Sequence, residues 1–498
     1  ISAVGYKSLR KEITLPSREK LTILLQEKTF FGDAAVVTAT RSRRDQESIP
    51  TPVSVVPEEE IQLNGTTRLN DILDEQTGLN VVNNFGSGVQ LQGLDPDYTL
   101  ILVDGEPLIG RSAGTLDLSR INVGNVKQIE IVKGPSSAIW GSDALAGVIN
   151  IITEEATKPF TADADLRYGN FNAYQTSARV GLRQGRFSSS TFVNLEGTEG
   201  NNLQDTPGTE SSVPSLMSTA IRTKNEYKLS DRLNLFGNFR YYYEDIENDF
   251  PFAVSATDTV LVGSNNILSD LSINPGVEVE FDIPLTIVAD YYLSRYNTKT
   301  RYSNFDTADP DLFQSNDFEQ FFQKIEFKNL YAWSGNNLTT LGFGQNIESL
   351  NADIYADGAD FTNNFLFLQH EWYAGSRLNL TGGFRFDNHS EYEQRLTPKF
   401  SALFKLNDTF HTRASIGSGF RAPDFRQLFL DFDNPVAGYS VFGARNALAG
   451  LKRLEERGQL GQMIIPESRL QNIDAETSLA INAGFDIYPD PFTTIRVN

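Results

Sequence analysis

The last two thirds of the chain, from Phe160 onward, alternate between apolar and polar residues with a period of two. In the stretch RLNLFGNFRYYYE, one set of alternate positions is apolar or small: Leu233, Leu235, Gly237, Phe239, Tyr241 and Tyr243. The other set is mostly polar: Arg232, Asn234, Asn238, Arg240 and Glu244. Successive side chains of a β-strand point to opposite faces, so the pattern predicts a long series of strands with one apolar and one polar face.

The expected strands are about ten to fifteen residues long, enough to cross a bilayer when a strand is tilted. Tight turns such as LSDR and YAGSR alternate with long polar connections near residues 199–217, 246–272, 301–316, 352–362 and 421–475. A soluble sandwich or propeller would also alternate, but its strands typically run about 5 to 6 residues. Short turns on one rim and long loops on the other are typical of an outer-membrane barrel. We expect residues 159–498 to form an incomplete transmembrane β-barrel of about fifteen strands.

Composition excludes several classes of protein. The chain has no cysteine, which rules out disulfides and thiolate metal sites, and its net charge of −21 argues against nucleic-acid binding. No apolar run approaches the roughly 20 residues of a transmembrane helix. No signal-peptide pattern begins at Ile1 and the sequence FTTIRVN stops inside an expected strand, so we expect a fragment at both ends.

Residues 50–158 read as one α/β domain. Within residues 127–155, two β-branched apolar runs, 129–132 and 148–152, flank a turn rich in small residues, which predicts two strands joined by a tight connection. Upstream, the run YTLILVDG ends in Asp104 and Gly105, a dipeptide that predicts a hairpin. A helix is expected where apolar residues share one face, with Thr66 or Thr67 as its N-cap. The three glycines of the connection are expected to serve backbone conformation and close packing: Gly134, Gly141 and Gly147.

Four stretches taken together resemble one known family. These are DAAVVTATR, LVDGEPL, IEIVKGPSSAIWGSDALAGVINIIT and GSGFRAPDFRQLF. The first three precede the long array of strands, and the fourth lies within it. As a set they resemble a TonB-dependent outer-membrane receptor. The resemblance implies an N-terminal α/β plug inside a 22-stranded barrel, shortened here to about fifteen strands. Residues 1–32 resemble the C-terminal part of a carboxypeptidase-regulatory-like β-sandwich, and the resemblance assigns residues 33–49 to a TonB box and linker.

The function implied by this resemblance is active uptake of a scarce ligand across the outer membrane of a Gram-negative bacterium. A ferric siderophore is the favoured ligand, with cobalamin or haem as alternatives. TonB and its inner-membrane energising complex would be the partners, and the receptor would be a monomer in outer-membrane lipid. A passive plugged porin or an adhesin is the alternative from another class. The sequence contains no H-E-x-x-H or G-x-S-x-G motif, so we do not expect an enzyme.

The resemblance also implies particular residues. The TonB box corresponds to Ala35, Val36, Val37, Thr38 and Ala39, although the same run would also suit the plug's first strand. An extended segment with free backbone groups can add to a partner's sheet edge. The plug motif corresponds to Asp104, Gly105, Lys133, Gly134, Pro135, Gly141 and Gly147. Many members have Arg-Gly where this chain has Gln92 and Gly93, and Glu in place of Asn482, so an ion-pair lock is not transferred. Lys133 remains a candidate plug anchor.

Ligand-binding candidates are polar residues expected on the inner face or in a long loop: Arg240, Tyr242, Arg385, Arg421 and Tyr439. The three histidines are expected to be structural, with His389 the closest to a loop. No intrinsic cofactor is expected, and the transported ligand is expected to contain iron. The acidic outer loops, such as EDIENDF and NADIYADGAD, would suit Ca²⁺ or simply remain solvated. Arg41, Arg43 and Arg44 are predicted to form a solvated linker.

Overall fold

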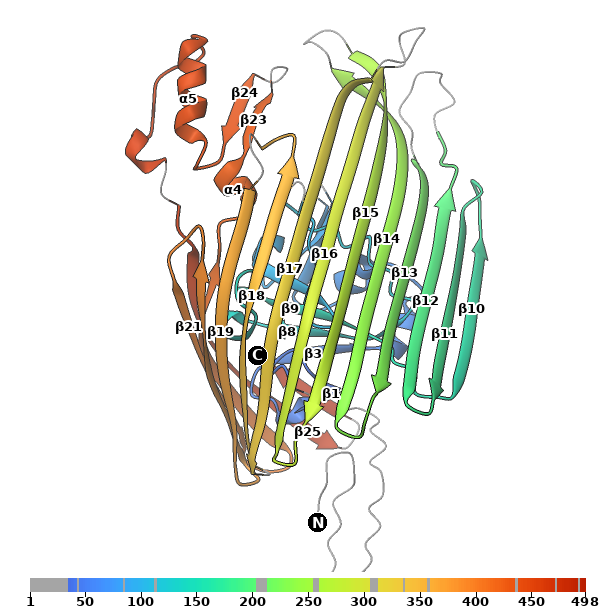
Figure 1. Ribbon diagram of the computed structural model, residues 1–498, viewed down its shortest axis with the longest axis vertical. Helices are drawn as coiled ribbons and strands as arrows, with labels where there is room; N and C mark the ends of the chain where they lie inside the picture. The colour runs from blue at the N-terminus through green and yellow to red at the C-terminus, as the bar shows by residue number, and fades with distance from the viewer. Residues whose placement is uncertain are drawn as a thin grey trace, which may run out of the picture.

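The computed structural model describes residues 35–498 except 43, 84–85, 112–113, 203–212, 254–258, 305–311, 335, 356–358, 435–437, 471–472 and 491–492. An N-terminal α/β unit, drawn in blue, lies within the curve of a large sheet (Figure 1). The predicted carboxypeptidase-regulatory-like segment, residues 1–32, lies outside the described residues. None of the described helices combines the length and apolarity needed to span a bilayer.

The large sheet has fifteen strands, and each pairs antiparallel with the next along it, which confirms the sequence-based expectation. The sheet is open, with β10 and β26 at its edges. Its strands are β10 (Phe160–Tyr168), β11 (Tyr174–Gln184), β12 (Phe187–Thr198), β13 (Ser215–Lys228), β14 (Leu233–Ala253), β15 (Thr259–Glu280), β16 (Leu285–Asn304), β17 (Leu312–Ser334), β18 (Asn337–Ala352), β19 (Ala359–Ala374), β20 (Leu378–His389), β21 (Arg395–Lys405), β22 (Phe410–Arg421), β25 (Glu476–Asp490) and β26 (Thr493–Val497).

The two faces of this sheet differ as the alternation predicts. On the outer face large apolar side chains are exposed, among them Leu195, Leu235 and Ile325. On the inner face Arg240, Tyr242 and Glu244 are buried. An apolar exterior and a polar interior suit strands that face lipid on one side and a filled lumen on the other.

One predicted loop is wrong. Residues 246–272 were expected to connect two strands, but β14 runs to Ala253 and β15 begins at Thr259. The two strands pair in register from Leu233 with Val279 to Ala253 with Thr259. A strand that extends beyond the bilayer meets water on its outer face as well, so its polar composition resembles that of a loop.

The N-terminal unit contains a five-stranded sheet in the order β3-β8-β9-β6-β7 and a separate hairpin, β4-β5. Its strands are β3 (Val53–Pro57), β4 (Leu79–Asn83), β5 (Ser87–Leu91), β6 (Thr99–Val103), β7 (Glu106–Pro107), β8 (Val126–Lys133) and β9 (Gly147–Thr153). The helical segments of this part of the chain are η1 (Gln46–Ser48), α1 (Glu58–Leu63), α2 (Leu69–Asp74), η2 (Pro96–Tyr98) and α3 (Ser137–Trp140).

Residues 127–155 form the predicted strand pair, since β8 and β9 are antiparallel neighbours. Their connection includes the single turn of α3, and its glycines have positive φ: 91° at Gly134, 85° at Gly141 and 156° at Gly147. A Cβ at Gly147 would lie 2.2 Å from the carbonyl oxygen of Val132, so only glycine fits there. The predicted hairpin is also present, with φ of 51° at Asp104 and 86° at Gly105 between β6 and β7.

The predicted cap of α2 is wrong. The N-cap residue is Arg68, and it makes no side-chain capping bond. The Thr66 hydroxyl instead donates to the Asp71 carboxylate at 2.6 Å. The expected apolar face is present, because Leu69, Ile72 and Leu73 are fully buried.

The long connection between β22 and β25 is itself structured and sits at the top of Figure 1. It contains α4 (Phe425–Phe429), β23 (Asp431–Asn434), β24 (Tyr439–Phe442), α5 (Ala447–Glu456) and η3 (Glu467–Arg469). Asp424 begins α4 with a capping box, in which its side chain accepts from the backbone N–H of Gln427 at 2.8 Å and Gln427 accepts from Asp424 at 3.0 Å. The loop therefore has a defined helix next to the end of β22.

Candidate functional site

The first described residues, 35–45, form a docked segment that lies between the N-terminal unit and the barrel wall. Its ends pair as a minimal hairpin of β1 (Ala35–Val36) with β2 (Arg44–Asp45). The centre is bound by Glu130, a fully buried residue of β8. The Glu130 carboxylate accepts from the backbone N–H of Val37 at 3.0 Å, and from the N–H and hydroxyl of Thr38 at 2.8 and 2.5 Å. The segment expected to be the TonB box thus pairs with the two-residue β2 and with a carboxylate, outside the five-stranded sheet.

Further contacts fix Thr38 and its neighbours. The Trp140 indole donates to the Thr38 carbonyl at 2.9 Å, and Asn150 donates to the Thr38 hydroxyl at 2.9 Å. Val36, Thr38 and Ala39 are buried. The N–H groups of Val37 and Thr38 and the hydroxyl and carbonyl of Thr38 are all bound within the fold, so adding this segment to another protein's sheet requires its release.

The predicted solvated linker is wrong at two of its three arginines. Arg41 is 9% exposed, pairs with Glu326 of β17 at 2.7 Å and lies over the ring of Trp140 at 4.5 Å. Arg44 pairs with Glu371 of β19 at 2.8 Å. Arg43 lies outside the described residues. The docked segment is therefore bound to the wall as well as to the N-terminal unit.

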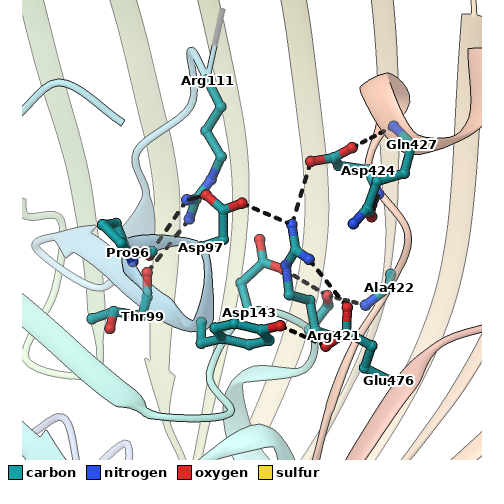
Figure 2. A network of polar contacts seen from close by, with 12 residues as sticks. Pro96, Asp97, Thr99, Arg111, Asp143, Arg421, Ala422, Asp424, Gln427 and Glu476 are labelled. Carbon is teal, nitrogen blue, oxygen red and sulfur yellow. Dashed lines mark hydrogen bonds and ion pairs between the residues drawn. The ribbon is translucent and has the colours of Figure 1, made fainter. Parts of the chain in front are cut away.

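Arg421, at the end of β22, connects the N-terminal unit to the long structured loop (Figure 2). Its guanidinium pairs with Asp97 at 3.2 Å, with Asp424 at 3.3 Å and with Glu476 at 3.5 Å. It also lies over the ring of Tyr98 at 5.3 Å. One arginine thus holds η2 of the N-terminal unit, the cap of α4 and the start of β25.

The same network extends through neighbouring residues. Arg111 pairs with Asp97 at 3.2 Å, and the Ser142 hydroxyl accepts from the backbone N–H of Ala422 at 3.0 Å (Figure 2). Burial raises the pKa of Asp97, although Arg111 and Arg421 both oppose this rise. The contact joins the loop to two separate parts of the N-terminal unit.

A cavity of about 230 Å³ lies beside this network. It is enclosed by residues 105–111 and 140–143 of the N-terminal unit, by wall strands β17 to β20, and by the start of α4. Phe361 and Phe425 both line the cavity and stack directly on each other, with ring centroids 3.9 Å apart. The other aromatic lining residues are Trp140, Phe318, Phe322, Tyr355, Phe365, His389 and Tyr392. The charged lining residues are Arg41, Arg111, Asp143, Lys324, Glu326, Glu348, Arg385, Asp424 and Arg426. The cavity can therefore offer both ring stacking and cationic contacts to a ligand.

Glu106 and Lys324 form a charged contact between β7 and the wall, with a 2.8 Å separation. Lys324 also lies 3.8 Å from Asp290 and from Glu326. Burial raises the pKa of Glu106 to about 7, and the attraction of the shared Lys324 reverses this only in part. The Glu106 carboxyl group therefore takes up a proton at a higher pH than an exposed glutamate does.

The structure brings only some of the predicted ligand residues together. Arg385 lines the cavity, where it pairs with Asp387 at 2.9 Å, and Arg421 lies in the adjoining network. Arg240 and Tyr242 are elsewhere on the inner face, bound to Asp270 at 2.8 Å and to Glu244 at 2.6 Å. Tyr439 is exposed on β24. These placements leave the ligand-binding role of all five as a prediction.

The sequence analysis did not predict several residues that line the cavity: Arg111, Phe361, Phe425, Arg426 and His389. His389 stacks on Tyr392 at 4.1 Å. The run DFRQLF carried a usable signal, because Asp followed three residues later by Gln marks a helix start.

The predicted plug anchor, Lys133, donates to the carbonyl of Thr77 within the N-terminal unit at 2.9 Å. Wall residue Asn482 instead packs on Gly134, where a Cβ would lie 2.9 Å from its amide nitrogen.

Comparison with known families decides the identity of this arrangement. The TonB-dependent receptor plug domain model matches residues 45–148, and the TonB-dependent receptor-like β-barrel model matches residues 154–498. The chain belongs to the TonB-dependent receptor family. The N-terminal unit is accordingly the plug, and the protein is located in the outer membrane of a Gram-negative bacterium.

Solved structures share this fold. A ferric enterobactin receptor (PfeA) mutant from Pseudomonas aeruginosa matches with a TM-score of 0.65 and 18% identity over 92% of this chain and 71% of that one. The siderophore receptor PirA from Acinetobacter baumannii gives 0.64 and 16% over 89% and 69%. The FpvAI–pyocin S2 complex gives 0.68 and 13% over 92% and 62%. The family and these similar structures are transport receptors.

Proposed function

We propose that this receptor imports a ferric siderophore, using the cavity between plug, wall and α4 as part of the binding site and TonB as the source of energy. The cavity is the observation that carries the proposal. It combines stacked aromatic rings with five cationic and four acidic side chains. Anionic and aromatic iron chelates would find both kinds of contact there. The similar structures support the choice of ligand class, since they include siderophore receptors.

The outer loops and the cavity have different charge. Acidic loops disfavour the approach of a bare anionic chelate, whereas the cavity's lining has one more cation than carboxylate. A ligand of low net charge with aromatic groups satisfies both regions best. Ca²⁺ bound to the outer loops stays a prediction, and among the described residues no group of three His, Asp or Glu side chains is placed to hold a metal ion.

Haem is the second candidate, because His389 lines the cavity next to Tyr392. Histidine and tyrosine are both axial ligands of haem iron. Cobalamin and the passive porin or adhesin have no such observation in their favour. If haem is the ligand, His389→Ala should weaken haem binding strongly. If a ferric siderophore is the ligand, the same substitution should leave siderophore binding within about twofold.

The test is parallel binding of ferric siderophores, haem and cobalamin to the detergent-solubilised receptor, followed by uptake into cells. We expect saturable binding of one ferric siderophore class, and loss of its uptake when a protonophore collapses the proton gradient. Phe425→Ala should weaken binding, while Phe432→Ala, in β23 of the same loop and outside the cavity's lining, serves as its matched control. Binding of haem or cobalamin alone, or uptake that persists without the proton gradient, would contradict the proposal.

We propose further that the docked segment is where TonB binds. Residues 35–39 lie shortly before residue 45, where the match to the plug domain family begins, and their first two residues are extended in β1. Their backbone donors at Val37 and Thr38 are bound by a single side chain, Glu130, so release exposes a ready strand edge.

A further inference from the structure

Three buried arginines meet where the plug touches strands β13 to β15. Arg222 of β13, Arg240 of β14 and Arg120 of the plug are 5%, 7% and 2% exposed. Arg222 and Arg240 are direct cross-strand partners in the sheet register. Like charges placed directly opposite one another repel, so this pair needs compensating negative charge.

A single carboxylate serves two of the three. Asp270, fully buried on β15, accepts two bonds from Arg240 at 2.8 and 2.9 Å, and Arg120 lies 3.2 Å from the same carboxylate. Arg222 donates to the amide oxygen of Asn125 at 2.9 Å, which is a neutral partner. In the described part of the chain no carboxylate oxygen lies within ion-pair distance of Arg222. Of the three buried arginines, two therefore have a carboxylate at ion-pair distance, whereas Asp104 and Asp270 attract Arg222 only from farther away.

Arg222 also faces a second cavity, of about 40 Å³, which Arg240 and Lys224 line with it. Its three acidic lining residues, Asp104, Glu106 and Glu154, are each paired with another cation: Lys224 at 3.5 Å, Lys324 at 2.8 Å and Arg179. The remaining lining includes neutral polar residues, among them Ser190, Asn238 and Asn274. A void of this size and polarity exceeds what one water requires.

We infer that this cavity is a binding site for one small inorganic anion, of the size of chloride or bromide, held by Arg222 and by Arg240 between plug and wall. A buried charge without a close partner of opposite sign is strongly unfavourable, and an anion here would supply the partner that Arg222 lacks. It would also link the plug, through Asn125, to strands β13 and β14. The site is separate from the cavity proposed for the transported ligand, and the inference does not depend on what that ligand is.

Bromide tests the inference because it replaces chloride and scatters X-rays anomalously. Crystals of the wild-type receptor grown in bromide should show an anomalous peak at hydrogen-bonding distance from the Arg222 guanidinium. In solution, the melting temperature of the detergent-solubilised receptor should rise saturably as bromide is added to a gluconate buffer, since gluconate is too large for the cavity. Arg222→Met should weaken the apparent bromide affinity at least tenfold.

Arg232→Met is the matched control, because Arg232 forms an exposed ion pair with Asp282 at a turn. This variant should keep the bromide dependence of the wild type. An ordered water in place of the anomalous peak, or an Arg222→Met variant with unchanged bromide dependence, would overturn the inference. If Arg222→Met does not fold, the presence or absence of the bromide peak in the wild type decides alone.

Discussion

Glu130 is the residue on which the state of the docked segment depends. Its carboxylate binds three donors from Val37 and Thr38 in a fully buried position. Hydrogen bonds to a charged group contribute about 1.5 to 3 kcal/mol each. The two backbone donors are the ones that a partner strand would use, so on the proposal that TonB binds this segment we expect Glu130 to compete with it.

Val37→Pro should abolish uptake while leaving ligand binding at the cell surface intact. Proline removes the N–H of residue 37 and restricts its φ, so the segment loses a donor that a sheet needs. Uptake of labelled ligand and surface binding, measured on the same cells, separate the two effects. Val37→Ala keeps the N–H and should transport normally. Equal uptake by Val37→Pro and wild type would show that TonB binds elsewhere.

Glu106 predicts a pH dependence of plug docking. Its pKa in the folded receptor, about 7, lies above the ordinary value of 4.5. A raised pKa means that the protonated Glu106 adds to the free energy of unfolding. This contribution is at most about 3 kcal/mol, is complete below pH 4.5 and is lost as the pH rises through 7. Wild type should therefore melt at lower temperature at pH 8 than at pH 5.5, and Glu106→Gln should reduce this difference. A difference that Glu106→Gln leaves unchanged would assign the pH dependence to other groups.

Single residues also show where sequence reading stops. Arg41 and Arg44 were predicted to be solvated because basic residues between two domains usually are. Their partners, Glu326 and Glu371, come from β17 and β19, far along the chain. No local pattern links such residues. The glycines of residues 134–147 were predicted correctly because the constraint on them, a tight connection between two strands, is local.

At the scale of elements, the structured loop after β22 is tied to the plug through one side chain. Arg421 binds residues of η2, β25 and the cap of α4. We therefore expect a change at η2 to reach α4, which lines the cavity, through this one residue at the end of β22.

Arg421→Met should loosen both ends of this connection. We expect faster amide hydrogen exchange in residues 425–429 and 96–99, because three carboxylates lose a shared cation. Arg445→Met is the control, since Arg445 lies in the same loop, pairs with Glu391 of the connection between β20 and β21, and is half exposed. Exchange that is unchanged in Arg421→Met, or equally fast in Arg445→Met, would contradict the proposed connection.

Strands and hairpins were predicted better than loops. Asp104 and Gly105 predict their turn because both residues readily adopt positive φ. The alternation in β14 follows directly from its apolar outer face and its polar inner face. The boundary near residue 246 was missed because polar residues continue along a strand once it leaves the bilayer. The cavity could not be predicted, since it depends on the distance between plug and wall.

Across the whole molecule, the outer face of the sheet predicts sensitivity to charge. Ile325 is 47% exposed near the middle of β17, the longest strand. Ile325→Arg should destabilise the barrel by about 2 to 4 kcal/mol, the cost of a cation at the bilayer midplane. Urea unfolding in lipid vesicles would measure this, and Ile325→Leu should be nearly neutral. A small effect of Ile325→Arg would place this position outside the hydrocarbon region.

The docked segment has a mechanical consequence. Its bonds follow one another along the chain: Val37 and Thr38 to the plug, then Arg41 and Arg44 to the wall. A force applied to the chain at residue 35 would load these bonds one after another. Each bond would therefore break under a smaller force than if all were loaded together. The first part of the pull would fall on Glu130 of β8, and the later part on the barrel wall through Arg41 and Arg44, before the chain itself drew on β3.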